Sequence, residues 1–181
     1  MTAPTSLHPQ PRRTGVVVLG LLLAAAAVLN GLPMLLALLF DSGATVIDRA
    51  LALALVLPGI TLVLLAGITA VHAGMGRTGA HAGPTSLAGR WASGMLGAAA
   101  IALMAFAIAA VVSDLDPVST DFFDNLWLAV PLLAAWVMAA AALVTSIVAA
   151  LRRDRSAAVL AILGISYSVT VFGVGEAVFP H

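Results

Sequence analysis

Glu176 is the acidic residue placed deepest inside an apolar run of the sequence, about one helical turn before that run ends. An ionisable group within a membrane span is costly and often marks a route for protons or ions. A carboxyl group here can accept a proton, pair with an arginine or hold a cation. The alternative is a carboxylate that reaches the membrane interface and stays hydrated. His181 follows five residues later, and a pair of these two side chains either belongs to such a site or tethers the chain terminus.

Two neutral polar residues also interrupt apolar runs. Asn30 precedes Pro33 in the first run, and a proline frees a helix carbonyl, so we expect a kink there with Asn30 bonding freed carbonyls or a neighbouring helix. Tyr167 lies near the middle of the last run, and its hydroxyl needs a hydrogen-bond partner, so we expect it to face the bundle interior. With Glu176 and His181, these residues form a candidate polar site within the membrane. A broken helix can shape a substrate site, although most such kinks are structural.

No other set of residues has the spacing of a catalytic or metal site. Cysteine is absent, which excludes disulfides and thiolate ligands. The histidines have no metal-binding spacing, and an acidic cluster near residue 120 does not match a calcium loop, so helix capping and a solvated surface explain it more simply. We therefore predict no catalytic residue, no metal and no cofactor. The residues considered for metal binding are His8, His72, His81, Asp114, Asp116, Asp121 and Asp124.

The amino-acid composition indicates whether the surface of this chain faces water or lipid. It has 181 residues, of which 62% are hydrophobic and only 9% charged, whereas soluble domains average about 25% charged residues. So few polar groups cannot cover a surface of this size, and the outside must therefore face lipid. The formal net charge is zero, so nothing in the total indicates nucleic acid as a partner.

Long apolar runs predict an all-α fold, a polytopic membrane bundle of five transmembrane helices. Each run is long enough to cross the hydrocarbon core as a helix, and none alternates with period two as a barrel strand does. Residues 1–14 contain three prolines and are expected to form a disordered cytoplasmic tail, while 15–181 form a single transmembrane domain. The predicted spans are 15–40, 46–73, 91–113, 125–151 and 156–179.

The arginines predict the orientation. If five spans alternate, seven of the eight basic residues share one side and only Arg49 lies on the other. The positive-inside rule then places the amino terminus in the cytoplasm and the carboxyl terminus outside a bacterial plasma membrane. The competing interpretation is a cleaved signal peptide in the first run, which leaves four spans in the same orientation. The seven are Arg12, Arg13, Arg77, Arg90, Arg152, Arg153 and Arg155.

Small residues are frequent within the runs. They let helix backbones approach closely in lipid, where van der Waals contact drives association. This pattern favours a compact bundle, or equally an interface with another membrane subunit or a second copy. The residues concerned are Gly94, Gly97 and Ala98 in the third run, Ala134, Ala135 and 139–142 in the fourth, and Gly164, Ser168 and Gly173 in the fifth.

The last 40 or so residues carry one further pattern: a span, then Leu151-Arg152-Arg153-Asp154-Arg155, then a span that closes on Gly175-Glu176-Ala177-Val178-Phe179-Pro180-His181. This stretch resembles the tails of uncharacterised small multi-pass membrane proteins of Gram-positive bacteria. The resemblance implies a type of fold and no activity.

Three functions remain open at this stage. The leading hypothesis is a non-enzymatic accessory or scaffold component, because the loops are minimal and no catalytic constellation is visible. The alternative is a small transporter or channel in which Glu176 responds to protons or cations, with Asn30 and Tyr167 lining its route. An intramembrane enzyme comes third. The expected partners are the lipid bilayer and another membrane subunit or a second copy of the chain.

Overall fold

The chain folds into five α-helices in the part that the structure, a computed structural model, describes. The described residues are 13–40, 43, 45–77, 79–112 and 125–178. No strand occurs within these ranges, so the prediction of an all-α fold is confirmed. The helices are α1 (Thr14–Phe40), α2 (Val46–Gly74), α3 (Leu87–Val112), α4 (Leu126–Leu151) and α5 (Ala157–Val178).

Four of these helices are long and apolar enough to cross a membrane, namely α1 to α4. In α5 the described apolar segment, Ala157–Val171, is shorter. The helix bounds agree with the predicted spans to within one residue, except at the start of α3. There the helix begins at Leu87, four residues before the predicted start, because Ser86 caps it: the hydroxyl of Ser86 accepts a hydrogen bond from the Gly89 N–H at 3.0 Å.

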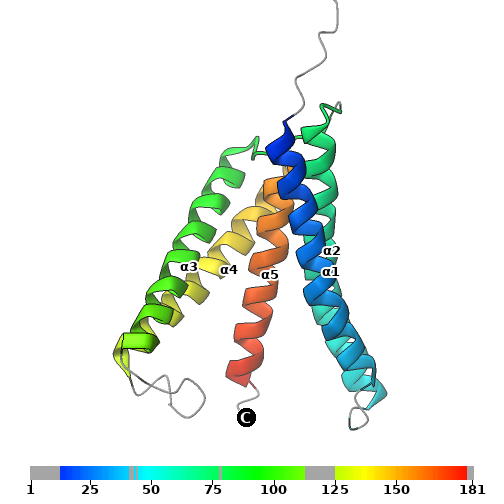
Figure 1. Ribbon diagram of the computed structural model, residues 1–181. Helices are drawn as coiled ribbons and strands as arrows, with labels where there is room; N and C mark the ends of the chain where they lie inside the picture. Colours follow the sequence, from blue (N-terminus) through cyan, green and yellow to red (C-terminus); the bar gives the residue numbers. More distant parts are fainter. Residues whose placement is uncertain (1–12, 41–42, 44, 78, 113–124, 179–181) are drawn as a thin grey trace, which may run out of the picture.

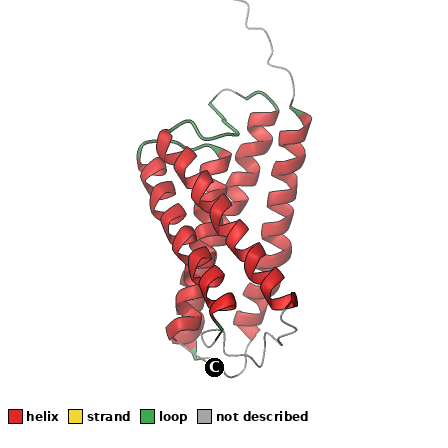
Figure 2. Ribbon diagram, turned by 90° about the vertical axis from the view of Figure 1, so that its left-hand side faces the viewer, coloured by secondary structure: helices red, strands yellow, loops and turns green. Residues whose placement is uncertain are grey.

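Consecutive helices run in opposite directions, and α5 lies between two helical hairpins (Figure 1). α1 packs on α2, and α3 packs on α4. Among the described residues the two hairpins do not pack on each other, whereas α2, α3 and α4 all pack on α5. The turned view shows the same arrangement from the side (Figure 2). The last helix therefore holds the two halves of the molecule together.

Glycines set the distance between α1 and α2. A Cβ atom at Gly20 would lie 2.7 Å from the carbonyl oxygen of Gly67, and one at Gly67 would lie 2.7 Å from the carbonyl oxygen of Gly20. Both obstacles are backbone atoms, which cannot move aside as a side chain can. The two helices thus meet backbone to backbone, the arrangement that small residues permit in lipid. At the end of this hairpin the Arg13 N–H donates to the carbonyl of Gly74 at 2.9 Å.

A second close crossing joins α2 to α5. A Cβ atom at Gly164 would lie 2.9 Å from Cγ2 of Val63 and 3.1 Å from the carbonyl oxygen of Gly59. A Cβ atom at Gly59 would collide with the hydroxyl of Ser168. This crossing is the route by which the first hairpin is attached to the rest of the bundle.

The core between α3, α4 and α5 is built mainly from alanines. Ala92, Ala142 and Ile162 form a buried cluster, against which Met95 and Leu96 pack. The predicted packing role of the alanines in the fourth run is confirmed for Ala135, Ala139 and Ala142, which are fully buried. Gly94 and Gly97 have no atom within 4 Å of an added Cβ, so packing within the bundle is wrong for these two glycines, and the alternative of an interface with another subunit or a second copy stays a prediction.

Candidate functional site

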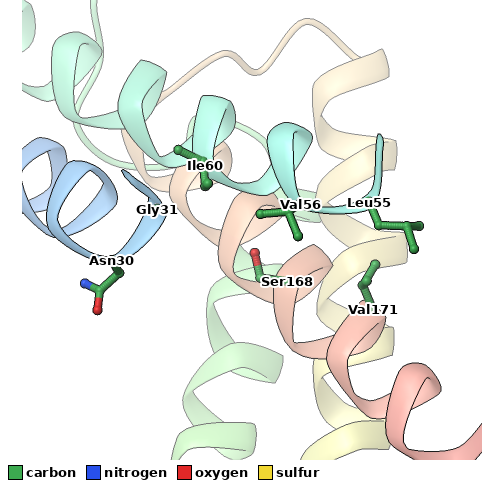
Figure 3. Close-up of a pocket in the computed structure, with 7 residues that line it drawn as sticks. All are labelled: Asn30, Gly31, Leu55, Val56, Ile60, Ser168 and Val171. Atoms are coloured by element: carbon green, nitrogen blue, oxygen red, sulfur yellow. The ribbon is translucent and has the colours of Figure 1, made fainter. Parts of the chain in front are cut away.

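A cavity of about 240 Å³ lies between α1, α2 and α5, and its lining includes one residue of the predicted polar site, Asn30. Its polar lining consists of Asn30 and Ser168, and the rest of the lining is apolar. Figure 3 shows Val56 of α2 above Ser168 of α5, with Gly31 of α1 to one side. The hydroxyl of Ser168 donates to the carbonyl of Gly164 at 2.9 Å, so it is already paired within its own helix. The cavity suits a small solute that is neutral and mostly apolar.

Asn30 lies at the rim of this cavity, and its side chain points away from Val56 (Figure 3). Its amide Nδ2 donates to the carbonyl of Ala26 at 2.8 Å. The carbonyl that Pro33 frees is that of Leu29, four residues before the proline. The prediction that Asn30 bonds a freed carbonyl or a neighbouring helix is therefore wrong, because the amide reaches back along its own helix to a carbonyl that the proline does not affect. α1 continues as one helix through Pro33.

Tyr167 is half-buried and lies beside the α2–α5 crossing rather than in the cavity lining. Its ring carbon Cδ1 would be 3.5 Å from a Cβ atom at Gly59. No hydrogen bond of its hydroxyl occurs within the described ranges. Asn30 and Ser168 thus line the same cavity, whereas Tyr167 is not part of its lining.

The other two residues of the predicted site lie at the carboxyl end. Glu176 belongs to helix α5, but its side chain lies outside the described residues, and so does His181. Their predicted pairing is therefore not tested.

A buried carboxylate, missed in the sequence, joins two helix starts. Asp154 is only 3% exposed. Its Oδ2 accepts hydrogen bonds from the backbone N–H groups of Thr85 at 2.9 Å and Ser86 at 2.7 Å, immediately before α3. Its Oδ1 accepts one from the Ser156 N–H at 3.3 Å, immediately before α5. A negative charge at two helix amino termini is favourable, since each carries partial positive charge and unpaired N–H groups.

Electrostatics at Asp154 follow from this geometry. Burial by itself raises the pKa of the carboxyl group, but the hydrogen bonds from Ser86, Ser156 and Thr85 outweigh it and hold the pKa well below the ordinary value of 3.8. Close approach is possible because a Cβ atom at Gly89 would lie 2.8 Å from Oδ2 of Asp154. The signal for this site in the sequence is an acid and a serine in the short segment between two apolar runs. The arginines of the same segment indicated only the orientation of the chain.

Two further contacts close the same end of the bundle. Arg153 has φ of 66°, and after it the N–H of Asp154 donates to the carbonyl of Ala149 at 3.0 Å. This is a Schellman ending of α4, which turns the chain toward α5. The N–H of Ala157 then donates to the carbonyl of His81 at 2.9 Å, so the loop between α2 and α3 lies on the first turn of α5.

We name this end of the molecule the arginine end. Among the described residues the one acid of this end is Asp154, whereas Asp48, in the first turn of α2, and Glu176, near the end of α5, belong to the opposite end. Arg49, in the first turn of α2, also lies at the opposite end. Arg12 lies outside the described residues. The described arginines of the arginine end are Arg13, Arg77, Arg90, Arg152, Arg153 and Arg155.

The outward face of α3 is the second feature with a possible role. Only 6% of the most apolar window of this helix is buried. Ser93, Gly94 and Gly97 lie on the exposed side, followed by Ile101 one turn later. Gly94 and Gly97 meet no neighbouring helix, as is also true of Gly15 in the first turn of α1. The glycines that do meet one include Gly20, Gly31, Gly59, Gly67 and Gly164.

Neither the surroundings of Asp154 nor the outward face of α3 contains a metal site, because within the described ranges no group of three His, Asp or Glu residues is placed to hold an ion. A comparison of the chain with protein-family models, curated proteins and solved structures finds no match. The resemblance of the tail to multi-pass membrane proteins therefore stays a prediction, and the functional argument depends on the geometry above.

Proposed function

We propose that this protein is an integral membrane accessory subunit that crosses a bacterial plasma membrane five times and binds a partner through the outward face of α3. The amino terminus and the arginine end face the cytoplasm, and the carboxyl terminus faces outward. The observation that carries the proposal is the pair of unpacked glycines, Gly94 and Gly97, on a helix whose most apolar window is only 6% buried.

The apolar exterior supports placement in a bilayer. Large hydrophobic side chains are exposed along α1 to α4, among them Leu29 at 73% and Ile101 at 73%. In water such a surface would associate without specificity, whereas in hydrocarbon it is in its proper solvent. Trp91 and Trp127 are both exposed and lie near opposite ends of the bundle, as residues of the two membrane interfaces do.

The charge distribution supports the orientation. All described basic residues except Arg49 lie at the arginine end, and short loops rich in arginine stay in the cytoplasm. Counting α5 as the fifth span takes the whole helix, as far as Val178, to be membrane-spanning, beyond the end of its described apolar segment.

A glycine inside a helix costs about 1 kcal/mol relative to alanine unless packing compensates for it. Gly20, Gly67, Gly59 and Gly164 have that compensation, since each lies against another helix. Gly94 and Gly97 lack it within this chain, and a transmembrane helix of another subunit would supply it. Small residues four apart, as Ser93 and Gly97 are, allow such an approach.

We test this with a photocrosslinking amino acid at Ile101, on the same face of α3. In native membranes it should give one adduct with a discrete mass above that of the chain. Gly97→Leu should reduce this adduct about tenfold, the effect of roughly 1.4 kcal/mol, because overpacking at a close interface costs about 1–3 kcal/mol.

The matched control is Ala25→Leu, which enlarges an exposed small residue on α1 and should leave the Ile101 adduct unchanged. An adduct of twice the chain's mass would show that the partner is a second copy of this chain rather than a different subunit. If no adduct forms, or if both leucine variants reduce it equally, the α3 face is not an interface.

The second candidate function is a small transporter or channel, favoured by the cavity between α1, α2 and α5. In this proposal Glu176 responds to protons or cations, and Asn30 lies beside the route. Glu176→Gln should then abolish solute-driven proton movement in proteoliposomes while leaving the bundle folded. Proton movement equal to that of the wild type would remove this candidate, and it would not affect the proposal for α3.

A further inference from the structure

A groove of about 560 Å³ runs along the bundle from the arginine end into its apolar part. It exists because α2 and α4 both pack on α5 but not on each other. The floor includes Leu160 and Leu163 of α5, and the walls include Thr69 of α2 and Ala150 of α4. It is separate from the cavity beside Asn30 and from the outward face of α3.

One charged side chain lines this groove. Arg155 lies at its end, in the loop between α4 and α5, and is exposed. No acid among the described residues faces it: Asp154, its neighbour, is the one acid of the arginine end and is turned to the N–H groups of Thr85 and Ser86. The guanidinium is therefore a positive charge at the mouth of an apolar channel.

The groove is long enough for the upper part of a lipid tail. Its lining residues on α2 run from Leu62 to Thr69, which is about 10 Å at 1.5 Å per residue. The hydroxyl of Thr69 donates to the carbonyl of Leu65 at 2.8 Å, so this wall presents no unpaired polar group. An apolar channel of this length with a cation at its mouth is complementary to the upper part of one acyl chain below an anionic headgroup.

We propose that this groove binds one anionic phospholipid of the cytoplasmic leaflet, with its phosphate on Arg155 and one acyl chain between α2 and α4. Basic pockets at the cytoplasmic ends of helices bind such headgroups. The inference depends on the membrane placement and orientation proposed above, but not on the interface at α3. Because the two hairpins meet only through α5, the lipid also fills the space between them.

The test uses the purified full chain in detergent, with phosphatidylglycerol or phosphatidylcholine added and bound lipid counted by native mass spectrometry. One phosphatidylglycerol should remain bound in preference to phosphatidylcholine. Arg155→Gln should weaken that binding about fivefold, the effect expected of one basic residue near an anionic headgroup. Arg90→Gln removes an exposed charge of the same end, on α3 and outside the groove, and should leave the binding unchanged.

A second variant tests the apolar part. Ala150→Phe fills the groove without changing charge, and it should weaken phosphatidylglycerol binding as much as Arg155→Gln does. If Ala150→Phe fails to fold, Thr69→Phe fills the opposite wall. Equal losses for Arg155→Gln and Arg90→Gln would show diffuse attraction rather than a site, and would overturn the proposal. Full binding in the folded groove-filling variant, or displacement by free glycerol phosphate, would overturn it as well. Membrane insertion is measured in a separate experiment, so a failure to bind phosphatidylglycerol in the groove can be distinguished from a failure of the proposed function.

Discussion

Asp154→Ala is expected to lower the free energy of unfolding by about 3 kcal/mol, the largest effect of any single change outside the helices. Hydrogen bonds to charged groups each contribute roughly 1.5–3 kcal/mol, and this carboxylate accepts three from backbone N–H groups, two of them part-buried and one buried. The change removes, at two helix starts at once, the acceptor of the N–H groups of Thr85, Ser86 and Ser156. Denaturant unfolding in micelles, followed by tryptophan fluorescence, measures it.

The control for this prediction is Arg152→Gln, which removes an exposed charge from the same loop and should shift the unfolding free energy by less than about 0.5 kcal/mol. Equal losses for the two variants would mean that Asp154 acts through net charge rather than through capping.

The pH dependence of the same difference follows from the sign of the pKa shift. The pKa of Asp154 in the folded chain is held below its ordinary value of 3.8. A depressed pKa gives a stabilisation that is complete above the unfolded value and is lost as the pH falls below it. The gap between wild type and Asp154→Ala should therefore be constant from pH 8 to about pH 5 and narrow below about pH 4. A gap that already closes near pH 6 would contradict the proposed hydrogen bonding.

Gly67→Leu is expected to separate α1 from α2, with a loss of about 3 kcal/mol or failure to fold. An added Cβ atom would lie 2.7 Å from the carbonyl oxygen of Gly20 and 3.0 Å from the Ala24 N atom. Overpacking against groups that can adjust costs about 1–3 kcal/mol, and backbone atoms in a helix adjust least. Unfolding in micelles again gives the magnitude.

Gly15→Leu is the matched control on α1, because no atom lies within 4 Å of a Cβ added there. It should change the unfolding free energy by a few tenths of a kcal/mol. A Gly67→Leu protein as stable as the Gly15→Leu protein would show that the two helices do not meet at these glycines.

The contrast between Gly67 and Gly97 shows what the sequence can and cannot predict about this fold. Length and hydropathy located all five helices, since a run of about 20 apolar residues is a strong signal. Spacing of small residues did not reveal which faces meet. In a soluble protein one face of a helix is polar, and this distinguishes inside from outside. Here both faces are apolar, so Gly94 and Gly97 resembled packing residues, while the paired Gly20 and Gly67 drew no attention.

The candidate site illustrates the same limit. The Asn30 side chain donates to the carbonyl of Ala26, four residues earlier in the same helix. A hydrogen bond to a helix carbonyl so near in the sequence is partly predictable. The carboxylate of Asp154 bonds residues 69 and 68 positions away, and no pattern near Asp154 names those partners. Likewise, Asn30 and Ser168 line the same cavity because α1, α2 and α5 come together there. Only the tertiary arrangement of the helices makes that pair visible.

The orientation of the bundle is the claim on which the proposed function and the lipid site both depend, and single-cysteine labelling tests it directly. The chain has no cysteine of its own, so Gly43→Cys and Thr85→Cys each provide one exposed thiol, at opposite ends. With a membrane-impermeant maleimide on intact bacteria in which the outer face of the plasma membrane is accessible, Gly43→Cys should be labelled, and Thr85→Cys should be labelled only after the membrane is permeabilised. Labelling of Thr85→Cys before permeabilisation, with Gly43→Cys protected, would contradict the account.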